Sequence, residues 1–260
     1  MLPLQVDRER FFKALEAAKK RDKAGIGTQN EKLVHATLKN YFYEEGAVME
    51  APVGSFVADL LYENEIFEIQ TSSFSYLKRK LPTLLAEHEV TVVCPLMRQK
   101  TLYWIDPQSG ALGGGRKSPK RGQPCHLLHE TFYLADFIGH PRFRIVIFLY
   151  DGEEYKLADG WSRDGKRGAH RKERVPTEVV DLFEISSEYD LALLLPRGCP
   201  PVFTTKEFSR LSSLRGLRLG AALKLLLQKG VVTREKKNRA YEYTVNRKEF
   251  IRYEFEKKDG

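Results

Sequence analysis

The chain has 260 residues, of which 42% are hydrophobic and 30% charged, a composition typical of a globular protein with a packed core. There are 43 Lys and Arg against 35 Asp and Glu, a net charge of +8 that favours a polyanionic partner such as nucleic acid. No basic-then-apolar leader and no apolar run of roughly 18 residues is present, so we expect no membrane association. The three widely spaced cysteines exclude a disulfide framework or a CxxC zinc site and favour the cytoplasm.

Two helices are expected at the start of the chain. Residues 1–24 form an amphipathic pattern with a basic end, and a second helix is predicted from a cap at Thr28 or Asn30 to a stop near Gly46. Its apolar face consists of Val34, Leu38 and Phe42. Glu31 shares this stripe, either as a first-turn acid favoured by the helix dipole or as a functional residue.

The next segments alternate between strands and a helix. Short strands are predicted at 47–53, 56–62 and 65–71, followed by a helix at 75–89 with a kink or break near Pro82. Residues 90–96, VTVVCPL, are mostly apolar, which is typical of a fully buried strand. This order predicts an α/β layer structure with a mixed sheet.

The middle of the chain, about 106–175, is rich in basic loops. A strand is expected at LYWID, a Gly/Pro-rich basic loop after it, a helix at LLHETFYLADFI, and a strand at FRIVIFLYDGEEYKL that runs into a turn. The segment GWSRDGKRGAHRKERV has a local net charge of +4. It is interpreted as a basic arm or, as is usual for such runs, a solvated linker.

The last part of the chain changes in composition. A helix capped by Thr204 or Thr205, with Glu207 as capping-box partner, is followed by a helix that ends at Gly230 and by a two-stranded ribbon. The apolar stripe of the second helix is Leu219, Ala222, Leu223 and Leu226. This order resembles the winged helix-turn-helix family over about 200–247. The resemblance implies a small winged-helix domain at 199–260 that binds DNA or, alternatively, protein.

A hairpin over residues 56–71 carries two unexpected acids. The turn at Tyr62–Glu65 predicts a register in which Leu61 faces Ile66, Leu60 faces Phe67 and Asp59 faces Glu68. Opposed carboxylates are destabilising unless a cation lies between them, and hard divalent cations select carboxylate oxygens. Gln70 shares the face of Glu68. The alternative is a pair of acids on a wet face, bonded to nearby Lys or Arg.

These residues, in this order of elements, resemble the PD-(D/E)XK nuclease family over about residues 28–95. Asp59 and Glu68 match the two acids of its motif, and Glu31 matches the acid that the preceding helix often contributes. Ala58 replaces the motif proline and Gln70 replaces the lysine. The resemblance implies a restriction-endonuclease-like core, a mixed central sheet flanked by helices, within residues 1–198.

The resemblance also implies a chemistry, namely phosphodiester hydrolysis with Mg²⁺ (or Mn²⁺). Asp59, Glu68 and the carbonyl of Ile69 would hold the metal, which lowers the pKa of a bound water. Gln70 would orient that water but has no titratable group. Either a water or the substrate phosphate then takes the proton, or Lys78 or Lys80 supplies the missing charge, or the site is impaired. Glu31 would hold a water or a second ion.

The expected function is a nuclease acting on DNA in repair, recombination or restriction. The alternative is a non-catalytic DNA-binding or regulatory protein on a degenerate nuclease core. RNA as substrate, endonuclease against exonuclease action, and a homodimer all stay open. The residues expected to contact the nucleic acid are basic: Lys78, Arg79, Lys80, Arg116, Lys117, Lys120, Arg121, Lys236, Lys237 and Arg239.

Overall fold

The computed structural model describes residues 5–23, 33–159, 170–237 and 240–246. The chain folds into two compact units, each assembled from three stretches that are separated in the sequence. The first unit contains Met1–Thr71, Thr91–Gly122 and Val146–Phe183, and the second contains Ser72–Val90, Gln123–Ile145 and Glu184–Gly260. The predicted domain boundary between residues 198 and 199 therefore falls inside the second unit.

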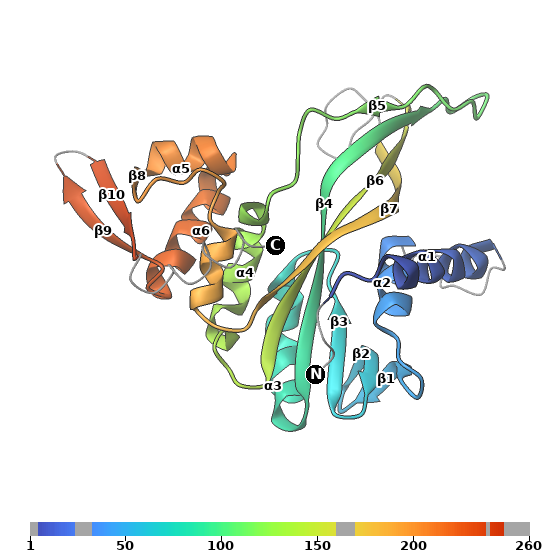
Figure 1. The fold of residues 1–260 in the computed structure, drawn as a ribbon, viewed down its shortest axis with the longest axis horizontal. Helices are drawn as coiled ribbons and strands as arrows, with labels where there is room; N and C mark the ends of the chain where they lie inside the picture. Colours follow the sequence, from blue (N-terminus) through green and yellow to red (C-terminus); the bar gives the residue numbers. More distant parts are fainter. Residues whose placement is uncertain (1–4, 24–32, 160–169, 238–239, 247–260) are drawn as a thin grey trace. The chain divides into compact units, whose positions relative to one another are not determined.

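Two helices begin the first unit, α1 (Arg8–Lys23) and α2 (Leu33–Phe42), and they pack against each other (Figure 1). The predicted apolar face of α2 is confirmed, because Val34, Leu38 and Phe42 are all buried. The expected caps of this helix, Thr28 and Asn30, lie outside the described residues.

The first unit is an α/β structure around a mixed sheet, as predicted. Its strands follow the order β1-β2-β3-β4-β6-β7, and β5 pairs with β4 off this path. The hairpin register is confirmed, since Leu60 pairs with Phe67 and Leu61 with Ile66. The strands are β1 (Val48–Val53), β2 (Phe56–Tyr62), β3 (Glu65–Ile69), β4 (Glu89–Ile105), β5 (Arg116–Lys117), β6 (Phe143–Leu157) and β7 (His170–Ile185).

β4 is longer than the sequence indicated, and β7 begins in a segment that was interpreted as a basic arm or linker. The buried run at 90–96 and the LYWID segment form one strand, β4. The strand predicted at FRIVIFLYDGEEYKL is confirmed as β6, which continues through Asp151 and Gly152. Gly152 is buried there, and a Cβ on it would lie 2.6 Å from the carbonyl oxygen of Val175, so the glycine allows close approach of β7 instead of a turn.

The core of the first unit lies between the two helices and the sheet. Aromatic rings dominate it: the centroids of Phe42 and Phe67 are 5.4 Å apart, and those of Tyr41 and Phe148 are 5.1 Å apart. Burial of each large apolar side chain contributes about 1.5–3 kcal/mol. This packing fixes α2 against the hairpin that carries the acids.

The second unit contains short helices and a small sheet. Pro82 lies inside α3, and the helix continues past it without a break. The predicted helix at LLHETFYLADFI is a short α-helix between 3₁₀ turns. The elements are η1 (Phe74–Tyr76), α3 (Leu77–Glu87), η2 (Pro124–Leu127), α4 (Leu128–Thr131), η3 (Phe132–Phe137), η4 (Tyr189–Leu194), β8 (Val202–Thr204), α5 (Thr205–Ser212), α6 (Gly216–Gln228), β9 (Val232–Lys237) and β10 (Ala240–Val245).

The C-terminal elements follow the predicted order. Thr204 caps α5 and forms a capping box with Glu207. On α6, Ala222, Leu223 and Leu226 are buried as predicted, and Leu219 is half-buried. The strand β8 was not predicted; it pairs with β10 and completes a three-stranded sheet in the order β8-β10-β9. None of the helices in the described part of the chain is long and apolar enough to cross a membrane.

Candidate active site

Asp59 is the best-defined residue of the predicted site. It lies on β2 between the fully buried Ala58 and Leu60, and its own side chain is 20% exposed. Its Oδ2 atom accepts a hydrogen bond of 2.7 Å from the backbone N–H of Ile69 and lies 3.4 Å from Nε2 of His35. The carboxylate is therefore held from both β3 and α2.

The electrostatic surroundings keep Asp59 ionised. Burial by itself raises the pKa of this carboxyl, but the hydrogen bond and charge of His35, the N–H of Ile69 and the charge of Lys39 outweigh it. The resulting pKa lies below the ordinary value of an aspartate. A carboxylate at this position is thus available as a ligand or counter-ion at neutral pH.

His35 and Lys39 are site residues that the sequence reasoning missed. They are four residues apart on α2 and so face the same side of the helix. Lys39 is only 4% exposed, and its Nζ bonds the carboxylate of Glu50 on β1. The available signal was this pair of residues, spaced by one turn, on a helix with a predicted apolar face.

Glu50 has an unusual backbone conformation. Its φ is +51°, in the left-handed region that costs a non-glycine residue of order 1 kcal/mol or more. Its neighbours Met49 and Ala51 pair with Leu60 and Ala58, so the register sets Glu50 opposite Asp59. His35 thus contacts Asp59 on β2, and Lys39 contacts Glu50, the residue opposite Asp59 on β1.

Glu68 and Gln70 lie at the end of β3. Glu68 is 5% exposed in a strand that is buried along its whole length. Because Leu60 pairs with Phe67, one further step in the same register brings Glu68 beside Asp59. Gln70 is half-buried, and its backbone N–H donates to the carbonyl of Val93 on β4 at 2.8 Å.

The donor atoms fit a hard cation. Asp59, Glu68 and the carbonyl of Ile69 offer oxygen only, and both contacts of Asp59 with other described residues use Oδ2, which leaves Oδ1 for a metal. Within the described ranges, no group of three or more His, Cys, Asp and Glu side chains could hold a metal ion. Two carboxylates suit Mg²⁺, which keeps several waters. Glu31 lies outside the described residues.

The predicted basic residues occur in three places. In the first unit, Arg116 and Lys117 form β5, and Lys120 and Arg121 follow it. In the second unit, the first turns of α3 carry Lys78, Arg79 and Lys80, with Lys78 paired to Asp136 at 3.2 Å. On β9, Lys237 pairs with Glu242 at 2.6 Å beside Lys236, whereas Arg239 lies outside the described residues.

The candidate site lies within a stretch of sequence shared with other proteins. Residues 32–186 match the family described as a domain of unknown function, DUF8091. The chain belongs to this family. The DUF8091 range begins one residue before α2 and ends one residue after β7, so it includes the hairpin acids, His35 and Lys39. The strands and helices from β8 to β10 follow it.

A relative matches the chain over most of both lengths. It is an uncharacterized protein of Treponema pallidum (strain Nichols), 28% identical over 209 residues, which are 80% of this chain and 82% of the relative. The similarity therefore extends beyond the length of the DUF8091 range. No solved structure matches the chain.

Proposed function

We propose that this DUF8091 protein is a metal-dependent nuclease that hydrolyses phosphodiester bonds in DNA. One observation carries the proposal: the ionised Asp59, beside the buried Glu68 in the hairpin register, is contacted by a basic face of α2. Acids that hold a cation, next to a buried lysine, are a suitable arrangement for a reaction on a phosphate.

The residues of the site would divide the work between metal binding, charge stabilisation and orientation. Asp59, Glu68 and the carbonyl of Ile69 would hold Mg²⁺ or Mn²⁺, which when bound lowers the pKa of a water and stabilises charge on the phosphate. Lys39 would supply from α2 the positive charge that Gln70 lacks. His35 would orient Asp59 through the contact of its Nε2 atom with Oδ2. Gln70 can orient a water by hydrogen bonding.

Cleavage assays test this proposal. Single-stranded, duplex, nicked and flapped DNA are incubated with Mg²⁺, with Mn²⁺ and with EDTA. We expect metal-dependent cleavage that is lost in Asp59→Asn and Glu68→Gln and kept in Glu45→Gln, a matched change at an exposed acid. Cleavage that persists equally in the first two variants would refute the assignment of these acids.

The second candidate is a non-catalytic DNA-binding or regulatory protein, and Gln70 in the lysine position favours it. This alternative predicts that DNA binding needs no divalent metal and that Asp59→Asn and Glu68→Gln bind DNA at least as tightly as the unaltered chain. Binding of Mn²⁺ that is lost in Glu68→Gln would count against it.

The second unit would dock the protein on DNA under either function. Its element order from β8 to β10 resembles a winged helix, and the guanidinium of Arg234 lies 4.4 Å from the ring centroid of Tyr241 on the neighbouring strand. Next to this pair, Lys236 is exposed. The test is the variant Lys236→Gln/Arg234→Gln, which should weaken DNA binding, with Lys13→Gln/Lys20→Gln on α1 as control.

A further inference from the structure

The long strands of the first unit extend into an arm. β4, β6 and β7 contain 17, 15 and 16 residues, whereas β1, β2 and β3 contain six, seven and five. The far halves of the long strands, together with β5, run past the short strands (Figure 1). We call residues 98–122, 151–159 and 170–177 the distal arm; all of them belong to the first unit.

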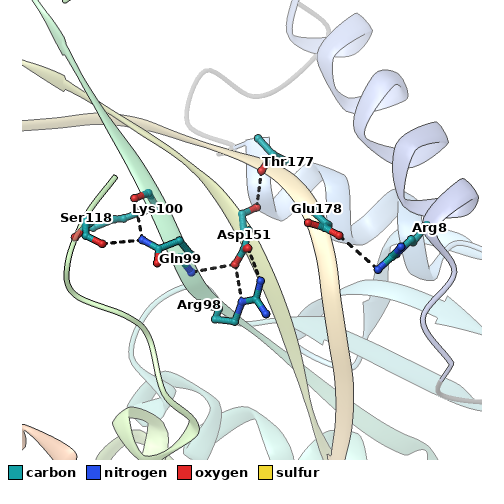
Figure 2. A network of polar contacts seen from close by, with 8 residues as sticks. All are labelled: Arg8, Arg98, Gln99, Lys100, Ser118, Asp151, Thr177 and Glu178. Atoms are coloured by element: carbon teal, nitrogen blue, oxygen red, sulfur yellow. Dashed lines mark hydrogen bonds and ion pairs between the residues drawn. The ribbon is translucent and has the colours of Figure 1, made fainter. Parts of the chain in front are cut away.

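Polar contacts centred on Asp151 join the strands at the base of the distal arm (Figure 2). Its carboxylate accepts hydrogen bonds from Nε and Nη2 of Arg98, at 2.9 and 2.6 Å, and from the backbone N–H of Gln99 at 3.0 Å. Its main-chain carbonyl accepts from Oγ1 of Thr177 at 3.1 Å. Three strands are thereby tied together through one residue.

The Gly/Pro-rich segment after β4 is an ordered part of the distal arm. It returns along β4 through backbone hydrogen bonds of 2.8 Å from Gly113, Ser118 and Gly122 to carbonyl oxygens of β4. Gln99 adds a side-chain bond of 2.7 Å to the carbonyl of Ser118 (Figure 2). A Cβ on Gly115 would lie 2.6 Å from the ring of Tyr103, so any other residue there would require this ring to shift. The backbone that carries the basic residues of the segment is therefore hydrogen-bonded along β4.

The exposed charged residues of the distal arm are mostly basic, whereas its buried acid is paired with basic residues. The arm contains ten Lys and Arg against six Asp and Glu, a net charge of +4. The buried Glu154 is neutralised by Lys100 at 2.9 Å and Arg174 at 3.1 Å, and Asp151 by Arg98. The charged residues left exposed are Arg116, Lys117, Lys120, Arg121, Arg171 and Lys172 against Asp106 and Glu173.

We infer that the distal arm binds the phosphate backbone of duplex nucleic acid, independently of base sequence. This inference deepens the proposed function, because it names where the substrate would be held away from the hairpin acids. Arg116 and Lys117 on β5, with Lys120 and Arg121 soon after it, place four exposed cations within six residues of a segment that is hydrogen-bonded to β4, which suits contact with several neighbouring phosphates. Because the backbone is already ordered, binding loses little conformational entropy.

Salt dependence of binding tests the inference without requiring catalysis. The affinity for a labelled DNA duplex is measured in EDTA between low and physiological salt, for the full chain and for Arg116→Gln/Lys117→Gln/Lys120→Gln/Arg121→Gln. Each lost phosphate contact should reduce the slope of log K against log salt by about 0.9, so the variant should lose about 2–4 units of slope and bind at least 10-fold more weakly at low salt. The four side chains are exposed, so the fold and thermal unfolding should be unchanged.

Matched variants decide the outcome. Arg8→Gln/Lys13→Gln/Lys19→Gln/Lys20→Gln removes the same charge from α1 and should leave the slope within about 0.5 units. Arg171→Gln/Lys172→Gln on β7 should reduce it by about 1–2 units. An unchanged slope in both arm variants overturns the inference. It is also overturned if the arm variants lose binding to vesicles that contain phosphatidylserine but keep their binding to DNA. A chain that cleaves no DNA but shows these slopes refutes only the nuclease proposal.

Discussion

The Nε2 atom of His35 on α2 lies 3.4 Å from the Oδ2 atom of Asp59 on β2, and one turn along the same helix Lys39 bonds Glu50 on β1. Asp59 and Glu50 face each other across the two strands. The helix α2 packs on the core and also brings two basic side chains into contact with acids of the sheet. His35 and Lys39 thus place basic groups beside the half-buried Asp59 and the exposed Glu50, which makes α2 part of the candidate site.

The contact between His35 and Asp59 predicts a pKa change. In His35→Ala the burial that raises the pKa of Asp59 remains, while the largest opposing contribution is removed, so this pKa should rise. Carboxyl chemical shifts of Asp59, followed by NMR from pH 2 to 7, measure it. An unchanged titration in the variant would mean that the N–H of Ile69 alone holds the carboxylate ionised.

The same carboxylate should make stability depend on pH. The pKa of Asp59 is lower in the folded chain than in the unfolded chain, so its contribution is complete above the unfolded value, about 3.9, and is lost as pH falls through the folded value. The difference in unfolding free energy between the natural chain and Asp59→Asn should therefore shrink below about pH 4. Urea unfolding at pH 3, 4, 5 and 6 tests this, and a constant difference would contradict it.

Lys39 should matter more for catalysis than for stability. Lys39→Met keeps the buried stem and loses the charge; because its partner Glu50 is 61% exposed, the pair itself adds little stability. If Lys39 stabilises charge on the phosphate, DNA cleavage should fall about 100-fold or more. Lys13→Met on α1 is the control. Equal cleavage by Lys39→Met and the natural chain would show that Lys39 takes no part in the reaction, while the assignment of the acids would stand.

Local patterns predicted the elements near the hairpin well. The turn after Tyr62 and the alternation of apolar residues determine the register, and the spacing of Val34, Leu38 and Phe42 determines the buried face of α2. The position of Glu50 opposite Asp59 could not be foreseen, because it depends on the pairing of a third strand and on a left-handed backbone at residue 50.

The distal arm shows why the middle of the chain was harder to predict. Asp151-Gly152 and the glycines at 113–115 are turn signals in the sequence, yet here glycine permits close contact between strands. Asp151 is part of a strand because Arg98 and Gln99, more than 50 residues away, bind its carboxylate. Such long-range contacts leave no periodic signal in the sequence.

Glu154 should be a sensitive point in the distal arm. Its pKa is lowered because the contacts with Lys100 and Arg174 outweigh the effect of burial. Lys100→Met leaves the buried carboxylate with one partner fewer and should lower the unfolding free energy by about 1–3 kcal/mol. In Glu154→Gln the same lysine change should cost less. A double-mutant cycle by urea unfolding measures this coupling, and a coupling energy of zero would mean that Arg174 alone satisfies the carboxylate.

The aromatic core predicts a larger effect on stability. Phe67 is fully buried, and its ring is stacked on Phe42. Phe67→Ala should lower the unfolding free energy by about 3–5 kcal/mol, since it removes apolar contacts and leaves a cavity. Phe12→Ala, at a side chain that is half-exposed on α1, should cost much less. Thermal unfolding of the two variants compares them, and equal losses would contradict the packing described for the core.

The environments of the buried Cys125 and the half-buried Cys199 predict slow alkylation. Burial raises the pKa of Cys125 and of Cys199 to about 11, and only the thiolate reacts with iodoacetamide. At pH 8 about one thiol in a thousand is then ionised, against about a quarter for an ordinary cysteine with a pKa near 8.5. The folded chain should therefore react far more slowly than the chain in urea. Rapid labelling of the folded chain, located by mass spectrometry at either cysteine, would show that the second unit opens around these residues.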